Sequence, residues 1–268
     1  MGPWLAFLLA VCAAQNQEAP AKPDAPRQEP ESKPVPYPGP AGREPVLYTG
    51  AVGRGLFPVS SMARDINAVP NGSPFPTGDL LAAFDWSDFF KAGVGGSLEF
   101  DLLWEPRRTE DAPAREDEWV MGAYATIGFD IFQGSKASDP HGSSLDPESL
   151  EVFSFLLGPK LVRHFGGGFF VDGRLGMGVV HYSSVDADMH LVPFGPGTPQ
   201  DFRGEFLAAS ATFGMELGFR GGLRSGSMSV VLGAGVRILA APERGNNAEV
   251  SASTLIALGI DLGVELGF

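Results

Sequence analysis

A histidine and a serine stand two positions apart at the end of a stretch that has the pattern of a β-strand. His181 and Ser183 follow residues 169–180, in which apolar residues alternate with small or polar ones. Side chains two residues apart on a strand point to the same face. An imidazole in that position can take the proton of the hydroxyl and make it a nucleophile. The pair is therefore a candidate catalytic site, with Ser183 as nucleophile and His181 as base, although both also suit an ordinary strand end.

Three potential metal ligands follow with the same spacing. Asp186, Asp188 and His190 offer two carboxylates and an imidazole, a donor set that suits a divalent ion. This spacing is common by chance in a polar loop. The sequence has no cysteine cluster, no His-x-x-x-His and no glycine-rich phosphate loop before a helix. We therefore predict no bound metal and no cofactor.

The composition excludes other classes of function. The chain has 268 residues, 36 of them glycine, and a formal net charge of -13. Binding to nucleic acid needs a basic surface, which this balance does not provide. The sequence also lacks the run of about 18 apolar residues from which a membrane-spanning helix is recognised, but strands of a membrane barrel need no such run because they alternate apolar and polar residues.

Residues 250–268 show this alternation over an unusual length. The even positions are apolar apart from Thr254, and the odd positions are mostly small or polar. Such a period of two predicts a strand. Strands of soluble sheets usually have about five or six residues, whereas a strand that crosses a membrane needs roughly 9–11. We interpret residues 250–268 as a membrane strand with its apolar face towards lipid.

The same pattern recurs along the chain and predicts an all-β protein. Further strands are expected at residues 228–240, 202–220, 169–182, 150–164, 119–132, 92–104 and, with weaker alternation, 46–58. Single-chain bacterial barrels have an even number of strands, so the weak first segment completes a count of eight. The fold class is an up-and-down antiparallel transmembrane β-barrel, with residues 46–268 as its domain.

The connections between these strands alternate in length. Short turns are expected at residues 221–227 and 166–168, with a longer one at 105–117, and long loops at 241–249, 183–201, 133–149 and 59–91. In the first long loop, residues 80–90 are expected to form a short helix capped by Thr77 or Asp79. Its aromatic residues are placed at the membrane interface; they are Phe84, Trp86, Phe89 and Phe90.

The amino-terminal segment suggests an exported protein. Residues 1–14 have the apolar stretch and small-residue ending of a signal peptide. Cys12 is the only cysteine, and a lipidated Cys12 is the alternative interpretation. Residues 15–45 are rich in proline, glutamate and lysine and are expected to be a disordered linker. The linker is either a plain tether or a contact to the cell wall.

A terminal phenylalanine after an alternating strand resembles the end of bacterial outer-membrane β-barrels. Residues 46–268 are similar in pattern to the OmpA/OmpX/OmpW-like eight-stranded barrels. The resemblance implies an outer-membrane location in a Gram-negative-type envelope, Phe268 as the assembly signal, and as partners the barrel assembly machinery, outer-membrane lipid and lipopolysaccharide. His181-x-Ser183 also resembles the His-x-Ser of the outer-membrane lipid A deacylases. Ser184 stands where that family has asparagine, and the family's downstream glutamate is missing.

The inward positions carry most of the predicted interior chemistry. An eight-stranded barrel has room for its own side chains or one small ligand, and buried charges must be paired. We predict a polar network, which either plugs the lumen or forms a narrow ion path. Asp130 and Arg237 are placed nearer the loop side, and the other members are Glu99, Asp101, Lys160, Asp172, Arg174, Glu216, Asp261 and Glu265.

The pattern leaves three functions open. The preferred one is a non-enzymatic structural or surface-interaction role, with the acidic outer loops as contact surface. The first alternative is a lipid A deacylase-like hydrolase using Ser183 and His181. The second is a soluble barrel that binds a lipid, which would need the apolar face inside.

Overall fold

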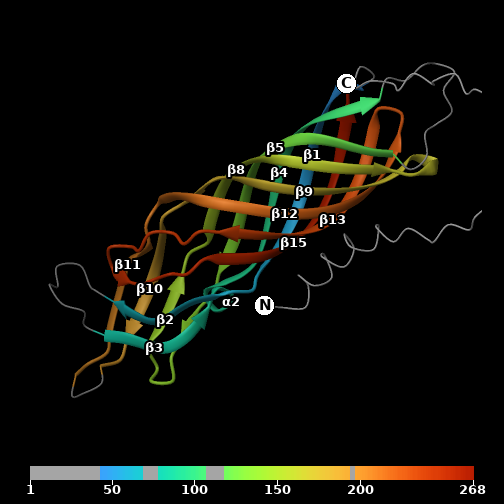
Figure 1. The fold of residues 1–268 in the computed structure, drawn as a ribbon. Helices are drawn as coiled ribbons and strands as arrows, with labels where there is room; N and C mark the ends of the chain where they lie inside the picture. Colours follow the sequence, from blue (N-terminus) through green and yellow to red (C-terminus); the bar gives the residue numbers. More distant parts are fainter. Residues whose placement is uncertain (1–42, 69–77, 107–117, 194–196) are drawn as a thin grey trace, which may run out of the picture. The chain divides into compact units, whose positions relative to one another are not determined.

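Eight long strands close into an antiparallel barrel. The computed structural model describes residues 43–268 except 69–77, 107–117 and 194–196, so the signal segment and nearly all of the linker lie outside the described residues. Around the barrel the order is β1-β15-β13-β12-β9-β8-β5-β4, and β1 pairs with both β15 and β4 (Figure 1). The bounds are β1 Arg43–Pro58, β4 Phe90–Pro106, β5 Glu118–Gly134, β8 Leu150–His164, β9 Phe169–Tyr182, β12 Ser210–Ser225, β13 Met228–Leu239 and β15 Leu255–Gly267.

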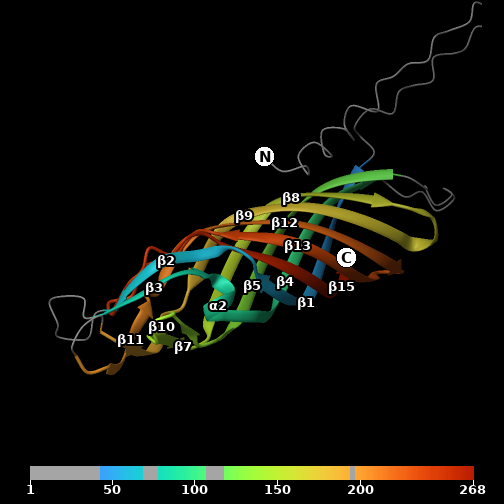
Figure 2. The ribbon, with the colours of Figure 1, turned by 90° about the horizontal axis from the view of Figure 1, so that it is seen from below.

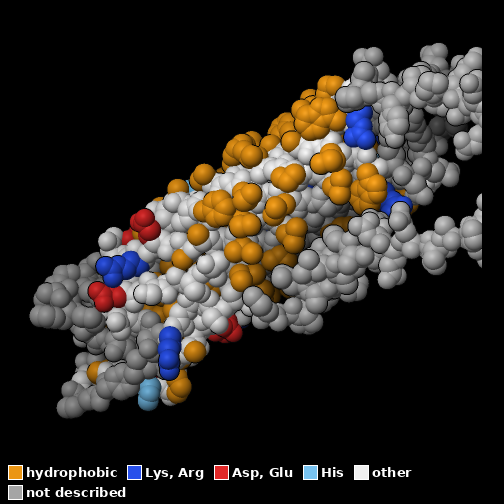
Figure 3. All heavy atoms as spheres, viewed as in Figure 1, with side chains coloured by type: hydrophobic (Ala, Val, Ile, Leu, Met, Phe, Trp, Pro, Cys, Tyr) orange, Lys and Arg blue, Asp and Glu red, His pale blue; other side chains and the backbone are white. Residues whose placement is uncertain are grey.

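The barrel wall is apolar outside and charged inside. On β15, Leu262 is 61% exposed while the neighbouring Asp261 is 4% exposed. The same alternation of exposed apolar residues and buried inward residues occurs on every barrel strand. The wall seen in Figure 3 is covered with hydrophobic side chains, with charged ones towards the two ends. A transmembrane barrel is built in this way. The prediction of the fold class is confirmed, and the soluble lipid-binding barrel is wrong because its apolar face would have to line the interior.

Aromatic residues mark one end of the apolar band. Trp104 and Trp119 are exposed on neighbouring strands, and Phe169 begins β9 close by. The guanidinium carbon of Arg163 lies 5.3 Å from the ring centroid of Trp119 and 5.1 Å from that of Phe165. Aromatic rings and snorkelling cations of this kind sit at a membrane–water interface.

The uncertain first strand is confirmed. β1 begins at Arg43 and pairs over most of its length with β4 and β15. Its inward residues include Tyr48, Val52 and Arg54. Small residues at its outward positions, such as Gly53, weaken the alternation in the sequence without weakening the hydrogen-bonded ladder.

The predicted strand 202–220 is wrong, because two strands occupy that segment. β11 (Gln200–Leu207) leaves the barrel, and β12 begins only at Ser210. Phe206 and Leu207 are adjacent and both fully buried, which a two-sided strand with a lipid-facing side does not allow. The predicted turn 221–227 shrinks accordingly, because β12 and β13 continue to a tight turn at Gly226 and Ser227.

Two small sheets stand at one end of the barrel. One has the order β11-β10-β7-β6, with β6 Ala137–Ser138, β7 Ser144–Pro147 and β10 Val185–Leu191, and the other has the order β14-β2-β3, with β2 Ser61–Ala68, β3 Gly78–Asp85 and β14 Ala248–Glu249. The segment before β14 joins them, since the amide of Asn247 donates to the carbonyl of Glu205 at 3.0 Å. We call these two sheets together the outer domain; Figure 2 shows them at the barrel end opposite the end of β15.

The helix predicted at residues 80–90 is wrong in extent. β3 runs to Asp85, and only α2 (Trp86–Phe89) is helical. The helix is capped by Asp85, whose backbone amide donates a hydrogen bond to Asp88 Oδ2 at 2.7 Å. The predicted caps, Thr77 and Asp79, are therefore wrong. None of the helices in the described part of the chain is long and apolar enough to cross a membrane.

The aromatics of this segment do not lie at the membrane interface. Phe84, Trp86, Phe89 and Phe90 are at most 4% exposed and belong to one large apolar cluster. We call it the outer core. It joins barrel residues such as Leu56, Phe132 and Tyr182 to residues of the outer sheets such as Leu145, Met189 and Phe206. These aromatic residues are therefore packed in the outer core and do not contact lipid.

Connection lengths alternate as predicted. At the end of the barrel away from the outer domain, η2 (Gly166–Gly168) joins β8 to β9, and Gly226 with Ser227 joins β12 to β13. Gly167, Gly168 and Gly226 have positive φ, which suits glycine at such tight turns. We call this end the turn side. The remaining turn-side connection, at 107–117, lies outside the described residues.

Candidate functional site: the charged barrel interior

Twelve charged side chains meet inside the barrel, and every barrel strand contributes at least one. None is more than 6% exposed. Five are cations and seven are carboxylates, all in the described chain: Arg54, Lys160, Arg174, Arg220 and Arg237, with Glu99, Asp101, Asp130, Asp172, Glu216, Asp261 and Glu265. The structure therefore brings together all ten predicted residues and adds Arg54 and Arg220.

Lys160 anchors the network towards the turn side. Its Nζ lies 2.5 Å from Asp101 Oδ2, 3.4 Å from Glu265 Oε1 and 3.5 Å from Asp172 Oδ2. These carboxylates come from three other strands. One ammonium group can make such contacts in several directions because its three donors rotate freely on a flexible stem.

Arg220 and Arg174 form the middle of the network and share Glu99. Arg220 contacts Glu99 at 2.6 Å, Glu265 at 2.9 Å and Asp172 at 3.3 Å. Arg174 contacts the other oxygen of Glu99 at 2.5 Å, Glu216 at 2.8 Å and Asp261 at 2.9 Å. A guanidinium presents several donors in a fixed plane, so each arginine ties three carboxylates to one position.

Arg54 and Arg237 complete the network towards the outer domain. Arg54 Nε lies 3.0 Å from Asp261, and its terminal nitrogens approach Glu216 at 3.7 Å and Asp130 at 4.0 Å. Arg237 Nε donates to Glu216 at 2.8 Å, and its Nη1 donates to Asp130. Asp130 and Arg237 thus lie on the loop side, as predicted.

Apolar layers close the network on both sides. Towards the turn side, Tyr48, Phe170 and Val231 belong to a cluster of six buried residues, and towards the outer domain the outer core fills the barrel. Beyond the turn-side cluster, Glu105 accepts a hydrogen bond from the hydroxyl of Tyr48 at 2.6 Å and from Arg224 at 3.3 Å. The charged side chains are therefore packed between two layers that offer water little access.

Arg54 and Arg220 were not predicted as interior residues, for different reasons. Arg54 lies on the strand with the weakest alternation, and Arg220 stood at the supposed end of a strand that continues to Ser225. The sequence nevertheless indicated that further interior cations were needed. The ten predicted residues hold seven carboxylates and three cations, and such an excess cannot be buried without further cations.

His181 and Ser183 are not joined in a catalytic arrangement. His181 is exposed on the barrel wall, and the hydroxyl of Ser183 accepts a hydrogen bond from the amide of Glu151 at 3.2 Å. The amide of Ser183 donates to the carbonyl of Glu151 at 3.0 Å. Within the described chain, no hydrogen bond connects Ser183 to His181. The serine therefore fixes the outer end of β8 against that of β9.

The three potential metal ligands lie on the exposed face of β10. Asp186 and Asp188 are register partners of Glu205 and Arg203 on β11, and Nδ1 of His190 lies 2.5 Å from Asp201. Arg203 also bonds to Glu148, and this contact raises its pKa. Among the described residues, no group of three or more His, Cys, Asp or Glu side chains is placed to hold a metal ion.

Phe268, the predicted assembly signal, lies at the turn side. Its side chain is 76% exposed, and its amide donates to the carbonyl of Leu47 at 2.9 Å. The terminal residue is thus held by β1 while its ring points away from the barrel interior. Its role in assembly stays a prediction.

Comparisons with known proteins give likenesses of fold. No family model and no curated protein matches the chain. Among solved structures, the chain is similar to Neisserial surface protein A, with 8% identity over 83% of this chain and 97% of that one and a TM-score of 0.34. It is also similar to Ail, the attachment invasion locus protein of Yersinia pestis. The structure of Ail with the heparin analogue sucrose octasulfate gives 11% identity over 83% and 99% of the two chains and a TM-score of 0.34. A second Ail structure gives 12% identity over 85% and 99% and a TM-score of 0.32. From its own wall, closure and interior, the chain is an eight-stranded transmembrane β-barrel.

Proposed function

We propose that the protein is an outer-membrane protein whose closed barrel anchors the outer domain at the surface of a Gram-negative-type cell. Its role is non-enzymatic, either structural or in surface interaction. The observation that carries this proposal is the interior network of twelve charges, packed between the outer core and the turn-side cluster. A barrel filled in this way is a support rather than a channel.

The orientation follows from the connections. In bacterial barrels the short turns face the periplasm and the long connections face the outside. The turns at η2 and at Gly226 lie on one side, and both sheets of the outer domain lie on the other. The outer domain is then the part that meets the surroundings of the cell, and Phe268 faces the periplasm, where the assembly machinery would read it.

The direct pairing of the interior charges supports a plug over an ion path. Each of the five cations lies within 4.0 Å of at least two carboxylates. An ion moving through would have to break these pairs inside a medium of low dielectric, where an unpaired charge is costly. The outer core adds a dry layer above them.

The contact surface proposed here is the exposed face of β7, β10 and β11, which we call the acidic face. Its opposite side, with Leu145, Ala187 and Met189, packs into the outer core. Arg203 and His190 are its basic residues in the described chain. Its carboxylates are Asp146, Asp186, Asp188, Asp201 and Glu205, with Glu148 directly after β7 and paired with Arg203. Such a field attracts a cationic partner and repels polyanions.

Other partners are proposed from the membrane setting. Outer-membrane lipid and lipopolysaccharide would contact the apolar wall. The linker predicted at residues 15–45 would contact the cell wall through the part that precedes β1 at Arg43. The non-enzymatic assignment is supported by Ser183, whose hydroxyl accepts from the Glu151 amide instead of bonding to His181.

Ion flux tests the closed anchor. Purified protein is reconstituted into phosphatidylcholine vesicles that carry a potassium gradient, and an ionophore added at the end shows that the gradient was intact. We expect the flux to equal that of vesicles without protein. Flux at the rate of an open pore would overturn the proposal.

The acidic face is tested with decalysine as a cationic probe. Binding to the same vesicles should fall several-fold in the triple variant Asp146→Asn, Asp186→Asn, Asp188→Asn. Glu249→Gln removes an exposed carboxylate on β14 and is the matched control, expected to leave binding unchanged. Equal binding by all three proteins would contradict this choice of contact surface.

A further inference from the structure

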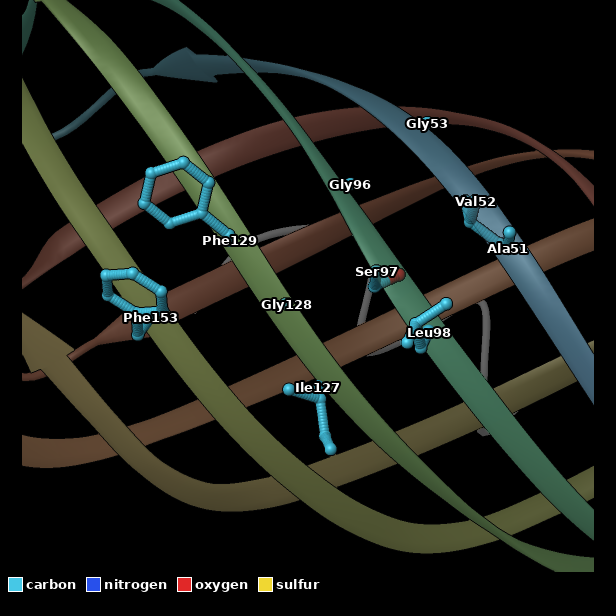
Figure 4. Close-up of a pocket in the computed structure, with 10 residues that line it drawn as sticks. All are labelled: Ala51, Val52, Gly53, Gly96, Ser97, Leu98, Ile127, Gly128, Phe129 and Phe153. Atoms are coloured by element: carbon cyan, nitrogen blue, oxygen red, sulfur yellow. The ribbon is translucent and has the colours of Figure 1, made fainter.

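A groove interrupts the lipid-facing wall where β1, β4, β5 and β8 run side by side. Its volume is about 490 Å³, which falls in the range of about 300–1,000 Å³ seen for small-molecule sites. The floor consists of Gly53 and Ala51 on β1 and Gly96 on β4. Figure 4 shows Phe129 and Phe153 side by side at one wall, and their ring centroids are 4.5 Å apart.

The surrounding wall is bulky, so the groove is local. Leu98, Ile127 and Leu262 flank the floor and are 55%, 53% and 61% exposed. Gly53 is the register partner of both Leu262 and Gly96. Two adjacent glycines, Gly53 and Gly96, thus leave a gap between rows of large apolar residues.

On β1 the backbone does not require glycine at the floor, whereas a Cβ atom on Gly96 of β4 would lie 3.2 Å from the carbonyl oxygen of Val52. A Cβ atom on Gly53 would meet nothing closer than the carbonyl oxygen of Leu262 at 3.7 Å. On the neighbouring outward Gly55 it would meet nothing within 4 Å. Neither residue is among the glycines with positive φ. The small residues therefore leave the groove open without being needed for the fold of β1.

The depth of the groove indicates its occupant. The outward apolar residues of β4 run from Val94 to Trp104, a length of about 33 Å along the strand. At the usual tilt this matches the apolar band, which is about 25 Å tall in membrane barrels. Gly96 is the next outward position after Val94, so the groove lies in the half of the bilayer nearer the outer domain. Acyl chains fill the membrane at this depth.

The width and the rim favour a single lipid chain over a second barrel. The floor spans two neighbouring strands, which lie about 4.8 Å apart. A second convex barrel would touch this wall along a narrow strip, whereas stable interfaces bury about 800 Å² per partner. At the outer end of β4, exposed Lys91 donates to the carbonyl of Ser87 at 3.2 Å, which leaves donors of its ammonium group for a headgroup phosphate.

We propose that this groove binds one acyl chain of a phosphate-bearing membrane lipid, with the phosphate at Lys91. Charged residues at the same strand ends also include Lys136 on the loop after β5 and Glu151 on β8. The inference rests on the transmembrane barrel and is independent of the closed lumen and of the acidic face.

Photolabelling tests the groove directly. The full chain is reconstituted into phosphatidylcholine vesicles containing phosphatidylglycerol with a diazirine in one acyl chain, irradiated, digested and analysed by mass spectrometry. We expect several-fold more label on peptides with residues 51–53, 96–98 and 127–129 than on the convex wall at Leu217 and Leu232. Even labelling, or groove peptides crosslinked between two copies, would overturn the proposal. Failure of the protein to insert at all would instead contradict the membrane barrel.

Two substitutions fill the groove, and one serves as control. Gly53→Leu and, independently, Ala51→Leu should lower labelling of the groove several-fold. Gly173→Leu adds the same side chain at an outward position of β9, where a Cβ would meet nothing within 4 Å, and should leave labelling unchanged. A shift in gel mobility on boiling shows that each variant is folded. Unchanged labelling in a folded Gly53→Leu or Ala51→Leu protein would overturn the site.

The headgroup contact has its own readout. In Lys91→Gln the preference for the phosphatidylglycerol probe over a diacylglycerol probe, which has no phosphate, should disappear, while the labelled positions stay the same. A preference that persists in Lys91→Gln would overturn the role of Lys91.

Discussion

Arg220 on β12 reaches across the barrel to Glu99 on β4, with Nη1 2.6 Å from Oε2. In the closed order of eight strands, β12 and β4 lie four positions apart in either direction and so on opposite walls. The same guanidinium contacts Asp172 and Glu265. One side chain therefore joins opposite walls of the barrel. The interior charges thus help to stabilise the closed barrel.

Removing Arg220 should destabilise the barrel strongly. Arg220→Met leaves Glu99, Asp172 and Glu265 buried with fewer cations, and loss of one partner of a buried ion pair costs about 3–5 kcal/mol. Urea unfolding in lipid vesicles, followed by tryptophan fluorescence, measures the change. Arg203→Met removes an exposed ion pair of the outer domain as control, and little change is expected there. Equal stability of the Arg220→Met protein and the original would contradict the role of the network.

A charge on the lipid-facing wall should cost stability according to its depth. Leu262→Arg places a cation near the middle of the outward residues of β15, where the expected cost is about 2–4 kcal/mol. Leu266→Arg lies towards the turn side, where the expected cost is about 0–1 kcal/mol. Unfolding in vesicles compares the two variants. Equal costs at both positions would indicate that this wall does not face hydrocarbon.

The outer domain should be weakened by loss of one ring while the barrel stays closed. Phe89 lies 5.0 Å from Phe84 and 5.4 Å from Phe206, measured between ring centroids, so it ties α2 to β3 and β11. Phe89→Ala should cost about 3–5 kcal/mol, seen as faster proteolysis within the outer domain. Val59→Ala changes a half-exposed residue and is the control. Loss of the heat-dependent gel shift in Phe89→Ala would contradict the separation of the two parts.

Lipid A should pass unchanged through a detergent assay with this protein. The hydroxyl of Ser183 bonds to the Glu151 amide at 3.2 Å and lacks a bond to His181, so we expect no loss of an acyl chain. Mass spectrometry of the lipid gives the answer. Release of one chain by the original protein, abolished in Ser183→Ala, would establish the hydrolase instead.

The membrane wall could be predicted because it requires the same period of two on every strand. Even β1, with Gly53 on its outward face, could be placed by the need for an even strand count. The outer domain could not be predicted in this way, since its strands are short and β14 pairs with β2 from the other end of the described chain. At Phe206 and Leu207 two adjacent residues are both buried, so the alternation of lipid-facing and inward residues does not apply there.

Ten of the twelve interior charges could be predicted from the sequence, but their contacts could not. Inward parity identified Glu99 and Arg174, whereas the sharing of Glu99 between Arg174 and Arg220 depends on the stagger of the closed barrel. In the sequence, the aromatic residues around Trp86 fit a membrane interface as well as they fit a buried core. Only the packing of α2 against β3, β7 and the Phe206 ring of β11 distinguishes a buried core from a membrane interface.

Electrophoresis of the detergent-extracted protein, boiled and unboiled, tests the closed membrane barrel most directly. A barrel held by its ladder and by the Arg220–Glu99 pair should resist detergent until it is heated. We predict that the unboiled protein migrates differently from the boiled protein and is found in the membrane fraction. Identical migration, with the protein in the soluble fraction, would contradict the account.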